Sequence, residues 1–94
     1  MEIELKPIYD NAKSFYKKAY IVKKDNVIKL YSYKTLVCVI LNGNRYQLNY
    51  NIDSDLLFSN TTLRHIKEFL KQYLNLSSYI TKNDIIKNNN KLLK

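Results

Sequence analysis

The sequence has little of what most enzyme and metal chemistry requires. Its 94 residues include one Cys, one His, one Gly, one Pro and no Trp. A single Cys excludes a disulfide scaffold and a cysteine-based zinc site, and a single His leaves too few strong ligands for a tight zinc site. The one glycine, Gly43, excludes a glycine-rich phosphate-binding loop. We therefore expect a protein that is not an enzyme and that has no cofactor and no metal site.

Long apolar runs and targeting signals are missing too. No run approaches the ~20 apolar residues of a membrane-spanning helix. Residues 1–6 lack the basic start and apolar middle of a signal peptide. Hydrophobic residues make up 46% of the chain and charged residues 26%, which suits one folded core rather than a disordered chain. We expect one small domain, complete over residues 1–94, located in the cytoplasm.

Acidic residues are also scarce. Asp and Glu number 8 against 16 Lys and Arg, so the formal net charge is +8. Fourteen of the basic residues are Lys, and Lys, Asn, Ile and Tyr, which A/T-rich codons favour, fill nearly half of the chain. Codon usage accounts for part of the Lys excess, but it would also have enriched Glu, which occurs only three times. The charge therefore favours nucleic acid, or a protein already bound to nucleic acid, as the partner.

The residues that are present predict an α+β fold. We expect a small antiparallel β-meander of about four strands over residues 16–50, packed by one amphipathic helix and followed by a short C-terminal helix. The strands are expected at 16–24, 27–33, 35–41 and 45–50. Asp25-Asn26 and Asn42-Gly43 separate strands and suit tight hairpin turns. Residues 1–15 form an N-terminal extension with a weak extended signal.

Two strands carry a clear burial pattern. Residues 35–41 are apolar on both faces, which is typical of a central strand. In the last strand, Tyr46, Leu48 and Tyr50 alternate with polar residues and are expected to point inward.

The main helix is expected over residues 61–76, after a loop at 51–60. Ser59 or Asn60 can cap it by accepting hydrogen bonds from its first free amides. Its apolar side chains fill one broad arc that faces the sheet. They are Leu63, Ile66, Phe69, Leu70, Tyr73, Leu74 and Leu76. The polar side is expected to carry His65 and Glu68.

After a Ser77-Ser78 break, Thr81 and Asp84 have the spacing of a capping box. They predict a short helix around Ile85 within residues 81–94. The Asn- and Lys-rich end of that segment is expected to fray.

Catalytic interpretations find little support. Cys38 lies in the most apolar strand and is expected to be a core residue rather than a thiolate. His65 lies early in an amphipathic helix, where a solvated residue or a partner for Glu68 is favoured over a catalytic group. Asp53 and Asp55 suit turn formation better than a weak cation site.

Lysines and tyrosines gather in the first two predicted strands. They are Lys13, Lys17, Lys18, Lys23, Lys24, Lys29 and Lys34, with Tyr16, Tyr20, Tyr31 and Tyr33. Such a face can stack bases and neutralise phosphates, although strand propensity for Tyr and protection of edge strands by Lys predict the same pattern. A basic stripe on the helix, Arg64, Lys67 and Lys71, suits a phosphate backbone or a solvated face. The candidate nucleic-acid-binding residues are Lys17, Lys18, Lys23, Lys24, Lys29, Tyr31, Tyr33, Arg64, Lys67 and Lys71.

Three segments carry a recognisable pattern: KSFYKKA at 13–19, LYSY with Thr35 and Val37 at 30–37, and TTLRHIKEFLKQ at 61–72. Together they resemble a family of small uncharacterised proteins from phages and prophages of low-GC Gram-positive bacteria, over about residues 6–73. The resemblance implies a mobile-element setting in a bacterial host cell and supports the β-then-helix order. It transfers no catalytic residues. The longer 51–58 segment and the Asn/Lys tail depart from the family pattern and leave open whether partners are shared.

Two functions of different classes follow. The first is a non-enzymatic accessory protein of a phage or mobile element that binds DNA or RNA through the basic, Tyr-rich surface. The second is an anti-defence protein, similar to an anti-CRISPR, that binds a host nuclease or nucleoprotein complex. Neither involves a membrane. A homodimer that pairs the exposed edges of two sheets is a further possibility.

Overall fold

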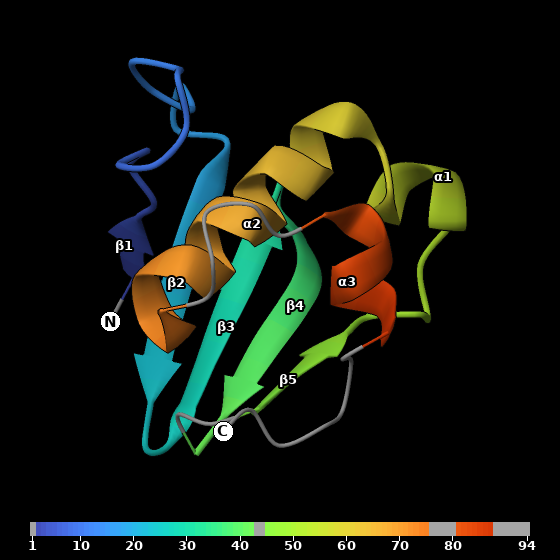
Figure 1. Cartoon of the computed structure of the whole chain (residues 1–94). Coiled ribbons are helices and arrows are strands. Elements are labelled where there is room, and N and C mark those ends of the chain that lie inside the picture. Colours follow the sequence, from blue (N-terminus) through green and yellow to red (C-terminus); the bar gives the residue numbers. More distant parts are fainter. Residues whose placement is uncertain (1, 43–44, 76–80, 88–94) are drawn as a thin grey trace.

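The computed structural model describes residues 2–42, 45–75 and 81–87 (Figure 1). Five strands form one antiparallel sheet in the order of the sequence, and the helices follow. The strands are β1 (Glu2–Glu4), β2 (Ala19–Lys24), β3 (Val27–Ser32), β4 (Thr35–Leu41) and β5 (Arg45–Leu48). The helices are α1 (Ser54–Leu57), α2 (Asn60–Leu74) and α3 (Lys82–Lys87). The predicted α+β class and the meander are confirmed.

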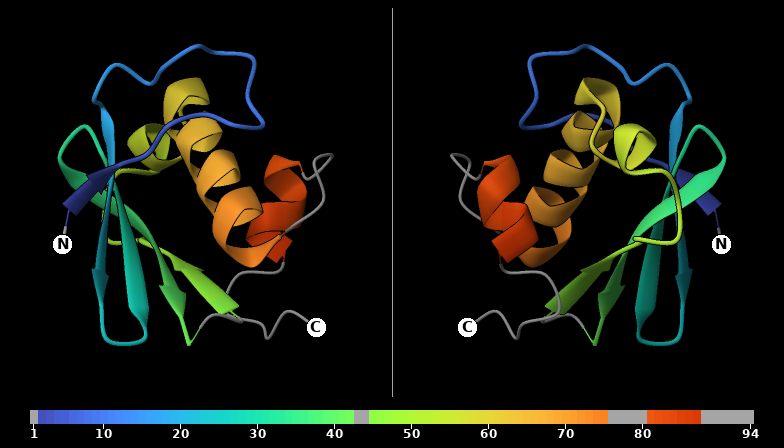
Figure 2. Two further views of the ribbon diagram at one scale, coloured as in Figure 1. Left: turned by 90° about the vertical axis from the view of Figure 1, so that its left-hand side faces the viewer. Right: turned by 90° about the vertical axis from the view of Figure 1, so that its right-hand side faces the viewer.

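The molecule has two layers. Both views in Figure 2 show the helices on one face of the sheet, and no described element lies over the other face. Between the layers lies a core of side chains with little or no exposure, which includes Leu30 and Ile40 from the sheet and Ile66, Phe69 and Leu70 from α2. We call the uncovered side of the sheet the open face.

The sheet differs from the prediction in its N-terminal part. It has five strands rather than about four, because Glu2–Glu4 in the extension pairs with β2, with Ile3 opposite Ile21. Three residues are too short a segment for alternation to be visible in the sequence. β2 begins at Ala19 rather than at residue 16, because Tyr16 and Lys17 adopt left-handed backbone angles that end extended structure.

The burial pattern of the last two strands is confirmed in part. Tyr46 and Leu48 are buried, whereas Tyr50 is 52% exposed because β5 ends at Leu48. β4 has paired strands on both edges, as predicted. The apolar residues on its two faces nevertheless differ in burial. Ile40 is fully buried under the helices, whereas Val39 is half-buried on the open face.

The main helix follows the prediction closely. Ser59 caps α2 by accepting a hydrogen bond from the Thr62 amide at 3.2 Å. The helix ends at Leu74, two residues before the predicted end at residue 76, which lies outside the described residues. The predicted loop at 51–60 contains the short helix α1, which buries Leu57.

The predicted capping box is also present. The Thr81 amide donates to Asp84 Oδ2 at 3.1 Å, and the Asp84 amide lies 3.2 Å from Thr81 Oγ1. The box opens α3, which buries Ile85 in the core. The Ser77-Ser78 break, Gly43 and the tail after Lys87 lie outside the described residues.

Candidate nucleic-acid interface

Two turns at one end of the sheet each place a Tyr-Lys pair in the left-handed region. Tyr16 and Lys17 have φ of 54° and 62°, and Tyr33 and Lys34 have φ of 52° and 69°. Left-handed geometry costs a residue with a Cβ about 1–2 kcal/mol, and Gly or Asn usually takes such positions. The Tyr33 amide donates to the Lys18 carbonyl oxygen at 2.8 Å, so the two turns lie side by side.

The two turns form one exposed surface. Two adjoining hollows there share Lys18 and Tyr33, and Lys34 and Tyr20 line one of them. Tyr16 is 75% exposed and Tyr33 45%. We call this set the Tyr/Lys surface: Tyr16, Lys17, Lys18, Tyr20, Tyr33 and Lys34.

A cation–π contact links two members of this surface, Lys18 and Tyr33. The Lys18 Nζ atom lies 5.4 Å from the centre of the Tyr33 ring. A lysine held over an aromatic ring in this way keeps its charge near the ring face. The Tyr/Lys surface therefore combines flat aromatic groups with ammonium groups, which are the two elements that bind bases and phosphates.

His65 packs beneath the Tyr33-Lys34 turn and contacts residues next to it. The ring is 1% exposed, its Nδ1 atom lies 2.8 Å from Ser32 Oγ, and the Phe15 ring packs edge-on with centres 4.6 Å apart. Burial, with the nearby charge of Arg64, lowers the pKa of His65 to about 4. The residue is therefore neutral near pH 7. The prediction that His65 is solvated or pairs with Glu68 is wrong, since its side chain turns toward β3.

Glu68 holds the loop that leads to the first turn. Its carboxylate is 2% exposed and accepts hydrogen bonds from the backbone amides of Ile8 at 2.9 Å, Tyr9 at 3.0 Å and Asp10 at 2.9 Å. Gln72 Nε2 lies 2.6 Å from the same group. Glu68 lies on the polar side of the helix, as predicted, but the N-terminal loop covers that side and buries the carboxylate.

Arg64 is engaged within the molecule. Its guanidinium binds both carboxylate oxygens of Asp10, with Nε 3.0 Å from Oδ2. This hydrogen-bonded ion pair lowers the pKa of Asp10 to about 2. Lys67 and Lys71 are half-buried on the same helix. The helix stripe thus has its arginine already paired with a carboxylate.

The remaining predicted residues lie beside the Tyr/Lys surface or away from it. Lys23 turns toward α2, with Nζ 5.0 Å from the centre of the Tyr73 ring, and Lys24 ends β2 at the far end of the sheet. Lys29 and Tyr31 lie on the open face, where Tyr31 is paired with Tyr20. Of the ten predicted residues, Lys17, Lys18 and Tyr33 belong to the Tyr/Lys surface, Arg64 lines one of its hollows, and Tyr31 lines a hollow together with Tyr20 and Lys34. The other members of the Tyr/Lys surface belong to the wider Lys and Tyr pattern of the sequence.

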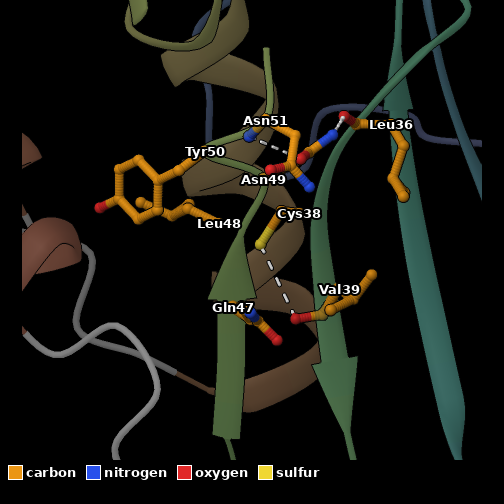
Figure 3. Close-up of a pocket in the computed structure, with 8 residues that line it drawn as sticks. All are labelled: Leu36, Cys38, Val39, Gln47, Leu48, Asn49, Tyr50 and Asn51. Atoms are coloured by element: carbon orange, nitrogen blue, oxygen red, sulfur yellow. Dashed lines mark hydrogen bonds between the residues drawn. The ribbon is translucent and has the colours of Figure 1, made fainter.

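A separate hollow of about 300 Å³ lies between β4 and β5 and is lined in part by Cys38, Gln47, Leu48 and Asn49 (Figure 3). Asn49 Nδ2 donates to the Leu36 carbonyl oxygen at 2.7 Å and closes one end of the hollow. Cys38 is fully buried, and burial raises the pKa of its thiol far above its usual range. The thiol form of Cys38 is therefore a packing group in the core, as predicted.

Across residues 2–42, 45–75 and 81–87, His, Cys, Asp and Glu form no cluster of three or more that could hold a metal ion. Within those ranges, no helix combines the length and the apolar character that crossing a bilayer demands.

The sheet with one covered face and the helices packed on it define a small α+β fold. The chain belongs to a family of unknown function (DUF8033), whose model matches residues 3–88. Comparison with curated proteins and with solved structures gives no match.

Proposed function

We propose that this protein is a non-enzymatic accessory protein of a phage or other mobile element that binds single-stranded nucleic acid through the Tyr/Lys surface. The observation that carries the proposal is the pair of strained Tyr-Lys turns. Backbone strain persists where side chains are needed for function. Asn-Gly would form a two-residue hairpin turn with less strain.

The chemistry of the surface suits a single strand. Tyr16 and Tyr33 are exposed enough for unpaired bases to stack on them, and Lys17 and Lys34 lie next to them in each turn. Stacking contributes about 1–3 kcal/mol per base and accepts any base. A duplex hides its base faces, so we expect it to bind more weakly.

Acidic side chains limit the surface on one side. Glu4 pairs with Tyr20 across β1 and β2, and Glu2 pairs with Val22. These carboxylates repel phosphates. The strand is therefore expected to pass from Lys17 and Lys18 over the Tyr33-Lys34 turn, and not along the β1 edge.

The structure supplies a matched pair of variants. We call the end of the sheet that carries the Tyr/Lys surface the turn end. Lys17→Glu with Lys18→Glu reverses two charges at the turn end, just before β2 begins. Lys23→Glu with Lys24→Glu makes the same change where β2 finishes. Fluorescence anisotropy with labelled single-stranded DNA and RNA, at low and near-physiological salt, measures both. The turn-end variant should bind about 100-fold more weakly, with the salt slope reduced by about 1.4, because each phosphate contact in a single strand contributes about 0.7.

The control variant, Lys23→Glu with Lys24→Glu, should lose less affinity, because it only lowers the net positive charge that attracts nucleic acid at long range. Equal losses in the two variants would show that the net charge binds nucleic acid without a defined surface. Absence of binding by the unchanged protein at low salt would contradict the proposal altogether.

A protein partner, such as a host nuclease or nucleoprotein complex, is the second candidate function. The N-terminal loop favours it, because Ile8 and Tyr9 are 70% and 51% exposed while Glu68 fixes their backbone. Exposed apolar side chains on a preorganised loop are typical of binding hot spots. Ile8→Asp with Tyr9→Asp should abolish capture of such a partner and leave nucleic-acid binding unchanged.

A further inference from the structure

A hollow of about 430 Å³ adjoins the Tyr/Lys surface and is lined by Glu2, Tyr20, Val22, Tyr31 and Lys34. Its volume lies in the range of about 300–1,000 Å³ that is usual for small-ligand sites. Tyr20 and Lys34 belong to the Tyr/Lys surface and also line one of the hollows there. A nucleotide held by the Tyr/Lys surface is therefore next to this hollow, which we call the base hollow.

Two aromatic rings form the middle of the base hollow. Strand register pairs Tyr20 on β2 with Tyr31 on β3, and paired residues in an antiparallel sheet share a face. Both side chains are half-buried on the open face, as is Val22. No described element lies over this face (Figure 2). Aromatic rings on an uncovered sheet face are a surface on which an unpaired base can stack.

Opposite charges lie on the two sides of this aromatic pair. Glu2 pairs with Val22 across β1 and β2, and Val22 is two residues, about 7 Å, from Tyr20 along the strand. Lys34 lies in the turn that follows β3, on the other side of the pair. In the part of the chain that the structure describes, no ion pair joins Glu2 to Lys34. The two charges are therefore available to a ligand.

These charges limit what the base hollow can accept. Glu2 repels a phosphate group placed beside it, and Lys34 repels a cationic group such as an arginine side chain. A carboxylate is, however, a good acceptor for the N–H groups of a neutral base edge. The ligand that fits carries N–H donors at the Glu2 side and an anionic group at the Lys34 side, as a nucleotide does.

The donor pattern distinguishes the four bases. Guanine has two neighbouring N–H donors on its Watson–Crick edge, at N1 and at the N2 amino group, and these match the two oxygens of one carboxylate. Adenine and cytosine have an acceptor nitrogen next to their amino group. Uracil and thymine have one N–H between two carbonyl oxygens. Guanine is therefore the base that a carboxylate such as that of Glu2 can bind with both of its oxygens.

We propose that the base hollow binds one guanine base of the bound strand, with Glu2 as the acceptor and the Tyr20-Tyr31 pair as the stacking surface. Lys34 binds the phosphate of the same nucleotide. The inference rests on the proposed function, because the strand that supplies the base is the one bound by the Tyr/Lys surface. It adds a base preference to a surface on which stacking alone accepts any base.

Fluorescence anisotropy compares a labelled oligothymidylate of about ten nucleotides with the same strand carrying one central guanine. The guanine strand should bind about tenfold more tightly, because a two-point contact to a base edge discriminates by this factor or more. Glu2→Gln should remove the preference, since a Gln amide has a single acceptor oxygen. Glu4→Gln is the matched control. It removes the same charge from the same face of β1, opposite Tyr20 but outside the residues that line the base hollow, and should keep the preference.

Titration with GMP, AMP, CMP and UMP, followed by NMR shifts of the Tyr20, Val22 and Tyr31 amides, tests the base hollow without a strand. GMP should bind about tenfold more tightly than the other three. Equal affinity for the two oligonucleotides, or a preference that survives Glu2→Gln, overturns the inference and leaves the proposed function standing. Failure to bind either oligonucleotide contradicts the proposed function. Selective GMP binding would then still support the guanine site, whereas equal binding of the four nucleotides would overturn it too.

Discussion

At the far end of the sheet, Asp25 follows β2 and Asn42 follows β4, with φ of 55° and 54°. At the turn end, the same left-handed geometry is adopted by Tyr16, Lys17 and the Tyr33-Lys34 pair. Asp and Asn visit this region at low cost, whereas Tyr and Lys do not. At the far end of the sheet, the residue types are therefore those that the left-handed backbone geometry favours. At the turn end, Tyr and Lys occupy positions that this backbone geometry disfavours.

The largest expected effect concerns the support of the turn end. Glu68→Ala removes the acceptor for three backbone amides of the N-terminal loop and should lower the free energy of unfolding by about 4 kcal/mol. Urea unfolding measures the loss. Lys67→Ala, on the neighbouring helix position, is the control and should change stability by less than about 0.5 kcal/mol. A loss as small as that of the control would show that the loop does not depend on this carboxylate.

Acid should weaken the turn end through His65. Its pKa is about 4 in the folded protein and 6.5 when unperturbed, so the unfolded chain binds more protons between these values. The contribution of His65 to the free energy of unfolding is therefore fully present above pH 6.5. It is lost as the pH is lowered, by about 3 kcal/mol at pH 4. His65→Gln should flatten this part of the profile. Asp10, with a pKa of about 2, stabilises the fold as a carboxylate. This part of the free energy of unfolding is lost only at lower pH, as the carboxylate becomes protonated.

Relief of strain should separate stability from binding. Tyr33→Asn with Lys34→Gly gives the second turn residues that favour φ above zero, and should raise the free energy of unfolding by about 2 kcal/mol. The same variant should lose nucleic-acid binding, because it removes a stacking ring and a charge. Denaturant unfolding and anisotropy on one preparation measure both. A variant that is more stable and still binds fully would remove the functional reason for the strain.

The smallest effect is the reverse exchange at the far end. Asp25→Tyr should cost about 1 kcal/mol, since a bulky residue would then occupy the left-handed position. Nucleic-acid binding should stay unchanged, because the Tyr/Lys surface lies at the other end of the sheet. Unchanged stability would mean that residue type matters little at these turns, and the comparison between the two ends would fail.

Sequence patterns predicted the parts of the fold that depend on nearby residues. The four longer strands, the Ser59 cap and the Thr81–Asp84 box all follow from local spacing. β1 escaped prediction because only its pairing with β2 defines it. The role of Glu68 escaped too, since a charged residue on a helix is usually solvated unless distant backbone amides bind it.

The candidate site shows the same division. Alternating Lys and Tyr indicated the correct side chains, and the structure gathers Lys17, Lys18 and Tyr33 from that prediction. The sequence could not reveal the turn geometry, because Tyr and Lys are not turn residues and instead suggest continuous strand. Nor could it show that Arg64 is paired, since Asp10 lies 54 residues away in the chain.

The bond between Glu68 and the Ile8 amide spans 60 residues, which fixes the order in which the protein can take shape during synthesis. At about 5–20 residues per second, Ile8 leaves the ribosomal active site roughly 3–12 seconds before Glu68 is added. Throughout that interval the N-terminal loop has no carboxylate to gather its amides. The N-terminal loop can therefore take up its final backbone arrangement only after α2 has been synthesised.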